Sequence, residues 1–191
     1  MYIIAGCNGA GKTTASFTVL PEMLGCKEFV NADEIAKGLS PFQPSSVAFQ
    51  AGRIMLARIE ELLHTKADFA FETTLSTLSY QKTIKQAQAR GFKVTLLFFW
   101  LNNVQLAIER VANRVSEGGH DIPIDTIIRR YYKGIYNLTK LFTKICDYWI
   151  VIDNSDSPFK FIAEGSMDQE IIIHDFQSWS FIKNSKHEKN N

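Results

Sequence analysis

The sequence predicts an α/β fold in three layers, built on a mainly parallel five-stranded sheet with flanking helices and a C-terminal antiparallel hairpin. Three observations support this prediction. Short apolar runs alternate with longer amphipathic ones, which is typical of βαβ units. A glycine-rich loop follows the first apolar run and precedes a helix-compatible segment. Near the end of the chain, two apolar runs flank a glycine-containing turn, which favours a hairpin.

Five apolar runs are the predicted parallel strands. They are Tyr2 to Ala5, Glu28 to Val30, Phe69 to Phe71, Lys93 to Leu101 and Tyr148 to Ile152. The fourth run is the longest apolar stretch, so it is the best candidate for the central strand. The hairpin is predicted over about 158–175, with strands at Phe159 to Ala163 and Glu170 to His174.

Apolar residues at helical spacing predict the helices between these strands. The first helix starts after Lys12 and ends near Pro21, before a second strand and a proline-containing loop over Gly38 to Ser46. Gly91 is a favoured C-terminal stop for a later helix. The other predicted helices are Val47 to His64, Thr77 to Arg90, Val104 to Ser116, Asp125 to Ile145 and a short one at Trp179 to Ile182.

Length and composition are those of a single globular domain. With 191 residues, 46% of them hydrophobic, the chain can bury a substantial core, so we predict one domain over 1–182 and a disordered polar tail over 183–191. A net charge of +1 gives no global basic field, so nucleic acid is not an expected partner. We expect a reducing, cytoplasmic location without membrane contact, because the cysteines are few and no secretory or bilayer-spanning run is found.

Residues 6–13, Gly-Cys-Asn-Gly-Ala-Gly-Lys-Thr, match the phosphate-binding pattern G-x-x-x-x-G-K-[ST] without a mismatch. Glycines let main-chain N–H groups approach phosphate oxygens, and the next helix directs its N-terminal amides at the same anion. Lys12 would reach the β and γ phosphates, and the Thr13 hydroxyl would ligate Mg²⁺. A plain turn before a helix is the alternative. The predicted nucleotide-binding residues are Gly6, Asn8, Gly9, Ala10, Gly11, Lys12, Thr13 and Thr14.

Two acids, Asp33 and Glu72, stand at the ends of predicted strands. Because ligands of open parallel sheets bind beyond the carboxyl ends of the strands, both should face the phosphate loop. We assign Asp33 the role of catalytic base, which accepts the proton of an attacking hydroxyl. Glu72 would hold Mg²⁺, directly or through water, or contact the substrate. The alternatives are a helix cap for Asp33 and a surface acid for Glu72.

Arginines gather around a predicted lid at about 115–130, which contains Gly118 and Gly119. Arg110 and Arg114 share one helix face, and two more arginines lie on the next predicted helix. The arrangement resembles the lid of small-molecule kinases, where closure neutralises charge and excludes water. A solvated basic face is the alternative for any single arginine. The predicted catalytic residues are Lys12, Asp33, Arg114, Arg129 and Arg130.

Three further positions are weaker candidates. Cys7 is expected at an exposed loop position beside a helix N-terminus and Lys12, an environment that can lower a thiol pKa, but we favour an inert thiol. His120 fits a loop or capping role better than a catalytic one. Asp153 and Asn154, at the end of the last core strand, are candidate neighbours of the nucleotide base.

With these segments located, the sequence resembles the zeta-toxin-like group of P-loop kinases, most closely the short bacterial branch often labelled predicted ATPases. Cys7 stands where this branch usually has proline, and the chain lacks the extra segments with which larger zeta toxins grip a nucleotide sugar. The resemblance covers the chain to about Asn154. It is carried by Ala5 to Thr14, Asn31 to Ile35, Phe71 to Leu75, Arg114-Val115, Gly118 to His120, Ile122-Pro123 and Arg129 to Tyr131.

The resemblance implies a three-layer P-loop NTPase fold of the small-molecule kinase type, with ATP as the nucleotide. The best-known members phosphorylate UDP-N-acetylglucosamine, so the implied reaction moves the γ-phosphoryl group of Mg-ATP to a hydroxyl of a small acceptor such as a UDP-N-acetylhexosamine. Toxins of this type are commonly held by an antitoxin protein, which is the implied partner. Matched residues are Lys12 in the phosphate loop, Asp33 as base, Glu72 as a substrate-contacting acid, and arginines among Arg114, Arg129 and Arg130 as phosphate clamps. Thr73, beside Glu72, is also predicted to bind the substrate.

Two other functions stay open. One is a kinase for another acceptor, such as a nucleoside, an antibiotic or a nucleic-acid end. The other is a slow ATPase that acts as a switch or binding module through a protein partner. Replacement of Asp33 would separate kinase from switch, because a kinase should lose acceptor phosphorylation and retain ATP binding, whereas a switch should keep its partner response.

Overall fold

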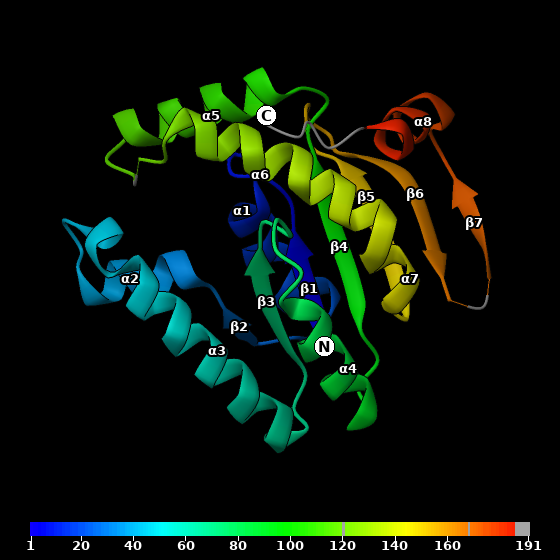
Figure 1. Ribbon diagram of the computed structural model, residues 1–191, viewed down its shortest axis with the longest axis horizontal. Helices are drawn as coiled ribbons and strands as arrows, with labels where there is room; N and C mark the ends of the chain where they lie inside the picture. The colour runs from blue at the N-terminus through cyan, green and yellow to red at the C-terminus, as the bar shows by residue number, and fades with distance from the viewer. Residues whose placement is uncertain (120, 168, 186–191) are drawn as a thin grey trace.

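The computed structural model describes residues 1–119, 121–167 and 169–185. It contains a seven-stranded sheet with the order β2-β3-β1-β4-β5-β6-β7 (Figure 1). Neighbours among β2, β3, β1, β4 and β5 pair in parallel, whereas β6 and β7 continue the sheet antiparallel. The predicted fold class is therefore confirmed. The strands are β1 (Tyr2–Ala5), β2 (Glu28–Val30), β3 (Phe69–Thr73), β4 (Thr95–Trp100), β5 (Tyr148–Asp153), β6 (Lys160–Ser166) and β7 (Gln169–Ile173).

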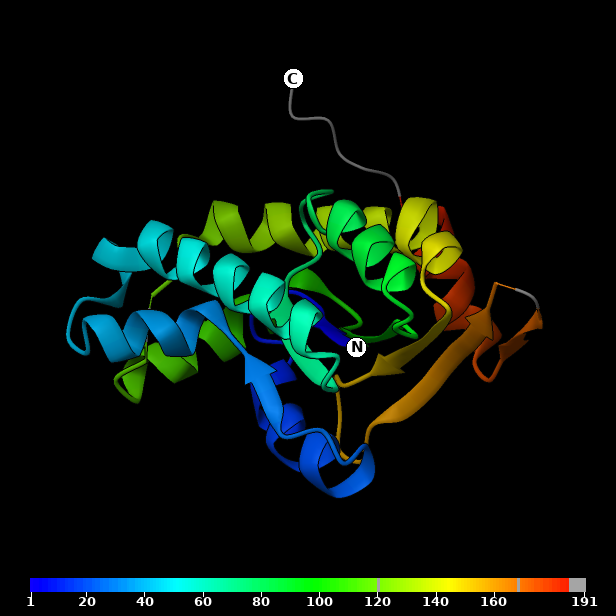
Figure 2. The ribbon, with the colours of Figure 1, turned by 90° about the horizontal axis from the view of Figure 1, so that it is seen from below.

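Helices cover both faces of this sheet. Figure 2 shows α1 on one face and α4, α6 and α7 on the other, which gives three layers. In Figure 1, α2 and α3 lie beyond β2 at one end of the sheet, and α8 lies at the other end beside the hairpin. The helices are α1 (Lys12–Thr18), α2 (Ala32–Leu39), α3 (Ala48–Thr65), α4 (Tyr80–Ala89), α5 (Val104–Ser116), α6 (Ile124–Asn137), α7 (Thr143–Ile145) and α8 (Phe176–Asn184), with π-helical segments at Val19–Met23 and Leu138–Phe142 and a 3-10 turn at Pro44–Val47.

The register of the central strands brings their carboxyl ends to one edge. Ile4 of β1 pairs with Glu72 of β3 on one side and with Leu97 of β4 on the other. The chain leaves β1 at Gly6, so the phosphate loop starts at this edge, between the ends of β3 and β4. The sheet order thereby fixes Glu72 beside the loop, as the strand-end argument predicts.

The segment between β3 and α4 differs from the prediction. The helix expected from Thr77 starts at Tyr80, because the hydroxyl-rich residues before it bond to one another instead of continuing a helix. Thr74 and Ser76 hydroxyls lie 2.8 Å apart, as do those of Thr77 and Ser79. The resulting loop lines part of the site described below.

The C-terminal helix α8 also starts earlier than predicted, at Phe176. Asp175 caps it by accepting a hydrogen bond from the Ser178 amide at 3.1 Å. The helix continues to Asn184, two residues into the predicted tail, and residues 186–191 lie outside the described part of the chain. Within that part, none of the helices combines the length and apolar character that crossing a bilayer requires.

The difference in burial between two phenylalanines predicts that their substitutions lower the free energy of unfolding by different amounts. Phe69 in β3 is 0% exposed, whereas Phe42 is 98% exposed. Phe69→Ala should lower the free energy of unfolding by about 3–5 kcal/mol, because it leaves a cavity between the sheet and its helices. Phe42→Ala should change it by less than about 0.5 kcal/mol. Chemical denaturation of both variants measures the difference, and equal losses would contradict this account of the core.

Candidate functional site

The loop between β1 and α1 is packed so closely that only glycine fits at two positions. A Cβ atom on Gly6 would lie 2.3 Å from the carbonyl oxygen of Phe99, and one on Gly9 would lie 2.7 Å from that of Ala107. Both residues also have positive φ angles, +143° and +80°, which glycine adopts without strain. Gly11 precedes α1 without a side-chain cap, so the first-turn amides of α1 remain available to an anion.

Glu72 contacts both side chains predicted to bind the polyphosphate. The buried ammonium of Lys12 lies 3.3 Å from Glu72 Oε1 and donates a hydrogen bond to the carbonyl of Cys7 at 2.9 Å. The Thr13 hydroxyl donates to Glu72 Oε2 at 2.7 Å. The acid at the end of β3 is therefore an internal counter-ion of the phosphate loop, not a surface acid.

Asp33 lies exposed in the first turn of α2, and its neighbour Asn31 caps that helix. Asn31 Oδ1 accepts hydrogen bonds from the amides of Asp33 at 2.8 Å and Glu34 at 3.4 Å. The alternative in which Asp33 itself is the cap is therefore wrong. Sequence reasoning assigned no role to Asn31, although an asparagine directly before a helical run is a recognisable N-cap signal.

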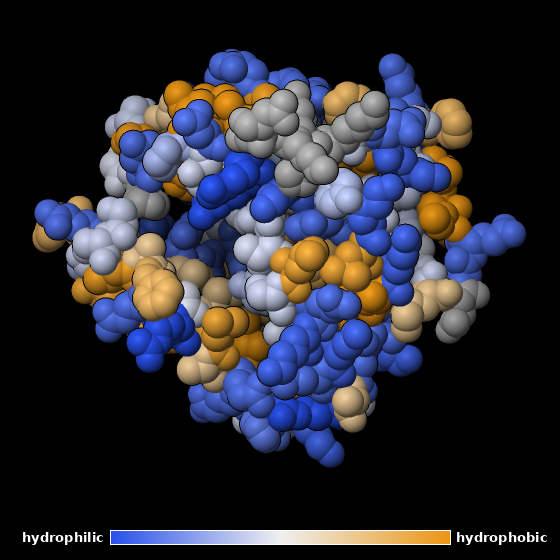
Figure 3. Space-filling model, in the orientation of Figure 1, coloured by the Kyte–Doolittle hydropathy of each residue, from blue (hydrophilic) through white to orange (hydrophobic). Residues whose placement is uncertain are grey.

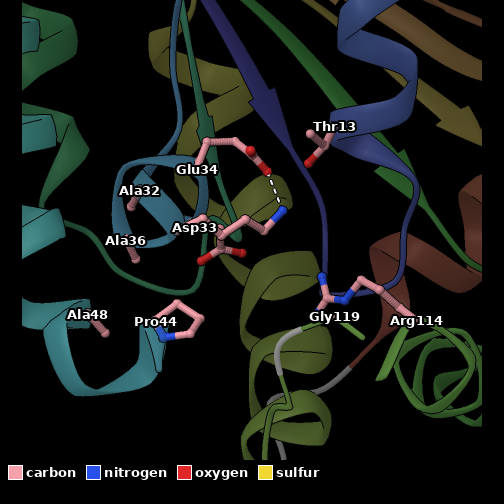
Figure 4. Close-up of a pocket in the computed structure, with 10 residues that line it drawn as sticks. Thr13, Ala32, Asp33, Glu34, Ala36, Pro44, Ala48, Arg114 and Gly119 are labelled. Carbon is pink, nitrogen blue, oxygen red and sulfur yellow. Dashed lines mark hydrogen bonds and ion pairs between the residues drawn. The ribbon is translucent and has the colours of Figure 1, made fainter. Parts of the chain in front are cut away.

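Asp33 stands between two cavities. The first has a volume of about 180 Å³, and its lining includes Thr13 and Arg114. Figure 4 shows Asp33 and Arg114 on opposite sides of this cavity, with Thr13 above them. The second has a volume of about 240 Å³, and its lining includes Glu72 and Arg130. In the space-filling view of Figure 3 the surface is hollowed between the α2–α3 end of the molecule and α5–α6, with hydrophilic residues at its rim.

The predicted clamp arginines divide into two groups. Arg114 lines the first cavity, and Arg130 lines the second and donates to Asn8 Oδ1 at 3.1 Å. Burial lowers the pKa of Arg130, and the charge of Asp33 partly offsets that shift. Arg129 is exposed and is not among the residues that line either of these cavities. The structure thus brings Arg114 and Arg130 to the cavities with Asp33, and it does not bring Arg129 there.

Arg110 has a different position from the one expected in the lid. Its guanidinium donates to the carbonyl of Asn154 at 2.8 Å and to that of Ser155 at 2.7 Å. Asn154 Nδ2 in turn donates to the carbonyl of Ala10 at 2.9 Å. Arg110 therefore ties α5 to the loop after β5, and Asn154 ties this loop to the phosphate loop. His120, within the predicted lid, lies outside the described residues.

Thr13 and Glu72 fit a magnesium ion better than a metal held by protein alone. Mg²⁺ takes hard oxygen ligands and usually binds few protein groups, together with water and substrate phosphates. Thr13 and Glu72 supply a hydroxyl and a carboxylate from adjacent positions. In residues 1–119, 121–167 and 169–185, His, Cys, Asp and Glu side chains form no group of three that could hold a metal ion.

Comparison with known proteins gives a family match and several related folds. A family model described as Zeta toxin matches residues 1–159. An uncharacterized protein of Haemophilus influenzae is 32% identical over 127 residues, which cover 66% of this chain and 88% of that protein.

Three solved structures have similar folds at low identity. A chain of the AvrRxo1-ORF1:-ORF2 structure with ATP has a TM-score of 0.75 at 16% identity, over 95% of this chain but only 62% of that one. A chain of the PezAT chromosomal toxin–antitoxin system of Streptococcus pneumoniae has a TM-score of 0.69 at 16% identity, over 95% and 77%. A gluconokinase from Sinorhizobium meliloti gives 0.54 at 16% identity, over 81% and 82%.

The environment of Cys7 predicts an unreactive thiol. Cys7 is only 5% exposed, so the expectation of an exposed position is wrong. Burial raises its pKa from 9.0 to about 11, although Lys12 and Arg110 act in the opposite direction. At pH 8 the thiolate fraction should fall about 100-fold relative to an ordinary cysteine, and burial should slow the reaction further. Mass-spectrometric detection of iodoacetamide labelling in native and urea-unfolded protein tests this, and rapid labelling of native Cys7 would contradict it.

Proposed function

The chain belongs to the zeta toxin family, and on this premise we propose that it is a kinase that transfers the γ-phosphoryl group of Mg-ATP to a hydroxyl of a small acceptor. The family match and the kinase among the related folds support a P-loop kinase-like enzyme that uses ATP. One observation carries the finer proposal. Asp33 lines both cavities, while Glu72, on the second of them, contacts Lys12 and Thr13 of the phosphate loop.

The proposed roles of the phosphate loop are supported by its geometry. Bound Mg-ATP would supply the phosphoryl group, and its metal would neutralise part of the phosphate charge. The first-turn amides of α1 and the Lys12 ammonium would hold the β and γ phosphates, and Lys12 would exchange its contact with Glu72 for phosphate oxygens. Thr13, with Glu72 directly or through water, would hold the metal. These assignments use side chains that already converge on one point.

The acceptor is proposed to bind in the second cavity. Its lining is rich in hydroxyl groups, which suits an acceptor that carries hydroxyls of its own. Asp33 would take the proton from the attacking hydroxyl, and Glu72 and Thr73 would orient the acceptor. A UDP-N-acetylhexosamine is the acceptor that the family resemblance favours. The hydroxyl-bearing residues of this lining are Thr73, Thr74, Ser76, Thr77 and Tyr80.

The lid is proposed to span about 115–130. Arg114 on α5 and Arg130 on α6 flank this segment and face the two cavities that share Asp33. Closure would bring both guanidinium groups toward the transferred phosphoryl group and exclude water.

An antitoxin protein is the proposed macromolecular partner. The similarity in fold to a chain of the PezAT toxin–antitoxin system supports this proposal. A cytoplasmic location is proposed as well, and the three buried free cysteines of the described chain are compatible with it. A slow ATPase switch that acts through such a partner remains the second candidate function, and the first experiment below separates it from a kinase.

Asp33→Asn should abolish phosphoryl transfer while nucleotide binding persists. With γ-labelled ATP and a panel of acceptors that includes UDP-N-acetylglucosamine, transfer should fall about 10²-fold or more, because the base is lost. Calorimetry should give a Mg-ATP affinity close to that of the unchanged protein. Asp68→Asn is the control, since Asp68 is exposed, directly precedes β3 at the end away from Glu72, and lines neither cavity. Unaltered transfer by Asp33→Asn would exclude Asp33 as base, and no transfer by the parent protein would favour the switch.

Arg130→Ala should reduce the transfer rate more than Arg129→Ala does. Arg130 is partly buried beside Asn8 and Asp33, whereas its neighbour in sequence is exposed. A desolvated guanidinium stabilises transition-state charge more strongly, and clamp arginines contribute roughly 10³-fold or more in such enzymes. Single-turnover kinetics with saturating Mg-ATP measures both variants. A larger loss of transfer rate in Arg129→Ala than in Arg130→Ala would show that Arg129, not Arg130, faces the transferred phosphoryl group when the lid closes.

A further inference from the structure

Asn31 joins three parts of the candidate site through a single side-chain amide. It lies between β2 and α2 and is 5% exposed. Its Oδ1 caps the helix that carries Asp33. Its Nδ2 donates to Glu72 Oε2 at 2.8 Å and lies 3.5 Å from the Thr13 hydroxyl. The two acids of the site are therefore connected by one rigid, planar group.

The hydrogen-bond pattern requires an amide at this position. Among neutral side chains, an amide offers an acceptor on one side and donors on the other. A carboxylate at position 31 would keep the cap but would set its second oxygen against Glu72. A serine would keep the cap, since serine is a favoured N-cap residue, but its hydroxyl is too short to serve Glu72 as well.

Nucleotide binding increases the importance of this contact. Two of the groups that hold Glu72, the Lys12 ammonium and the Thr13 hydroxyl, are those that a polyphosphate and its metal would engage. The Asn31 amide does not compete for phosphate in the same way, because Oδ1 already fixes it to α2. It can therefore hold the Glu72 carboxylate when the other two contacts are exchanged.

We propose that Asn31 is a positioning residue, whose amide locks Glu72 and the first turn of α2 into one unit and so fixes the separation of Glu72 from Asp33. The importance of that separation rests on the proposed kinase function. The link that Asn31 makes between Glu72 and α2, here called the lock, does not depend on that function and can be tested without measuring enzyme activity. Asn31 is among the residues that line the second cavity, but its proposed role is exerted through Glu72 and Asp33.

The simpler role, a helix cap alone, makes different predictions. Asn31→Ser retains the cap and removes the donor to Glu72, and Asn31→Asp retains the cap and turns the donor into an acceptor. Asn103→Ser is a matched control, because Asn103 also caps its helix through Oδ1, accepting from the Leu106 amide at 2.8 Å, and is exposed. A cap alone predicts no difference between the substitutions at 31 and 103.

Hydrogen–deuterium exchange of the nucleotide-free protein tests the lock directly. Peptides that cover residues 72–79 should exchange at least about tenfold faster in Asn31→Ser and Asn31→Asp than in the parent protein and in Asn103→Ser, while melting temperatures stay within a few degrees because the cap is kept. Unchanged exchange at 72–79 in both Asn31 variants would overturn the proposal, whatever the enzyme's activity.

Kinetics test the consequence for the site. With Mg-ATP, and with UDP-N-acetylglucosamine as acceptor probe, Asn31→Ser should lower kcat at least tenfold, while its Kd for the Mg complex of a non-hydrolysable ATP analogue stays within about threefold of the parent value. A parallel loss of analogue affinity, or an unchanged kcat in an active parent enzyme, would overturn the positioning role. An inactive parent enzyme would instead refute the proposed function, and exchange at 72–79 would still decide whether the lock exists.

Discussion

The buried ion pair between Lys12 and Glu72 is the interaction on which the site depends. An ammonium taken out of water needs a partner of opposite charge, and the carboxylate lies 3.3 Å away on the neighbouring strand. The parallel pairing of β1 with β3 puts that carboxylate next to the loop. The ion pair therefore depends on the order of the strands in the sheet, because only a strand next to β1 can bring a carboxylate to the phosphate loop. On the proposed function, an anion would compete with Glu72 for the Lys12 ammonium, so its affinity would reflect an exchange of partners.

The remaining parts of the site are attached to this pair by short polar links. Asn31 connects Glu72 to α2, and Arg110 with Asn154 connects α5 and the loop after β5 to the phosphate loop. Each link ends on a main-chain group or on Glu72, so it positions backbone as well as side chains. Asp33 lines both cavities, Arg114 lines the first and Arg130 lines the second, so these three side chains are also available to a ligand.

The sequence predicts the sheet and the phosphate loop well, because both depend on local signals. β1 and β2 have the predicted bounds: β1 is a largely buried apolar run, and β2 ends on the buried Val30. What it misses depends on contacts between distant segments. The burial of Cys7, the structural role of Arg110 and the exposure of Arg129 arise when α5 and α6 pack beside the loop, and periodicity does not determine which arginine faces inward. The N-cap role of Asn31 can be predicted from the sequence. Its hydrogen bond to Glu72 cannot, because the two residues are 41 positions apart in the chain.

The close contacts at Gly6 and Gly9 have a thermodynamic consequence. Carbonyl groups of β4 and α5 lie so close to Gly6 and Gly9 that they restrict the conformation of the loop in the absence of a ligand. A phosphate that binds a preformed loop does not have to order it. The conformational entropy that a flexible loop would lose on binding has already been lost during folding. On the proposed function, tight packing around the loop would therefore lower the entropic cost of binding the anion.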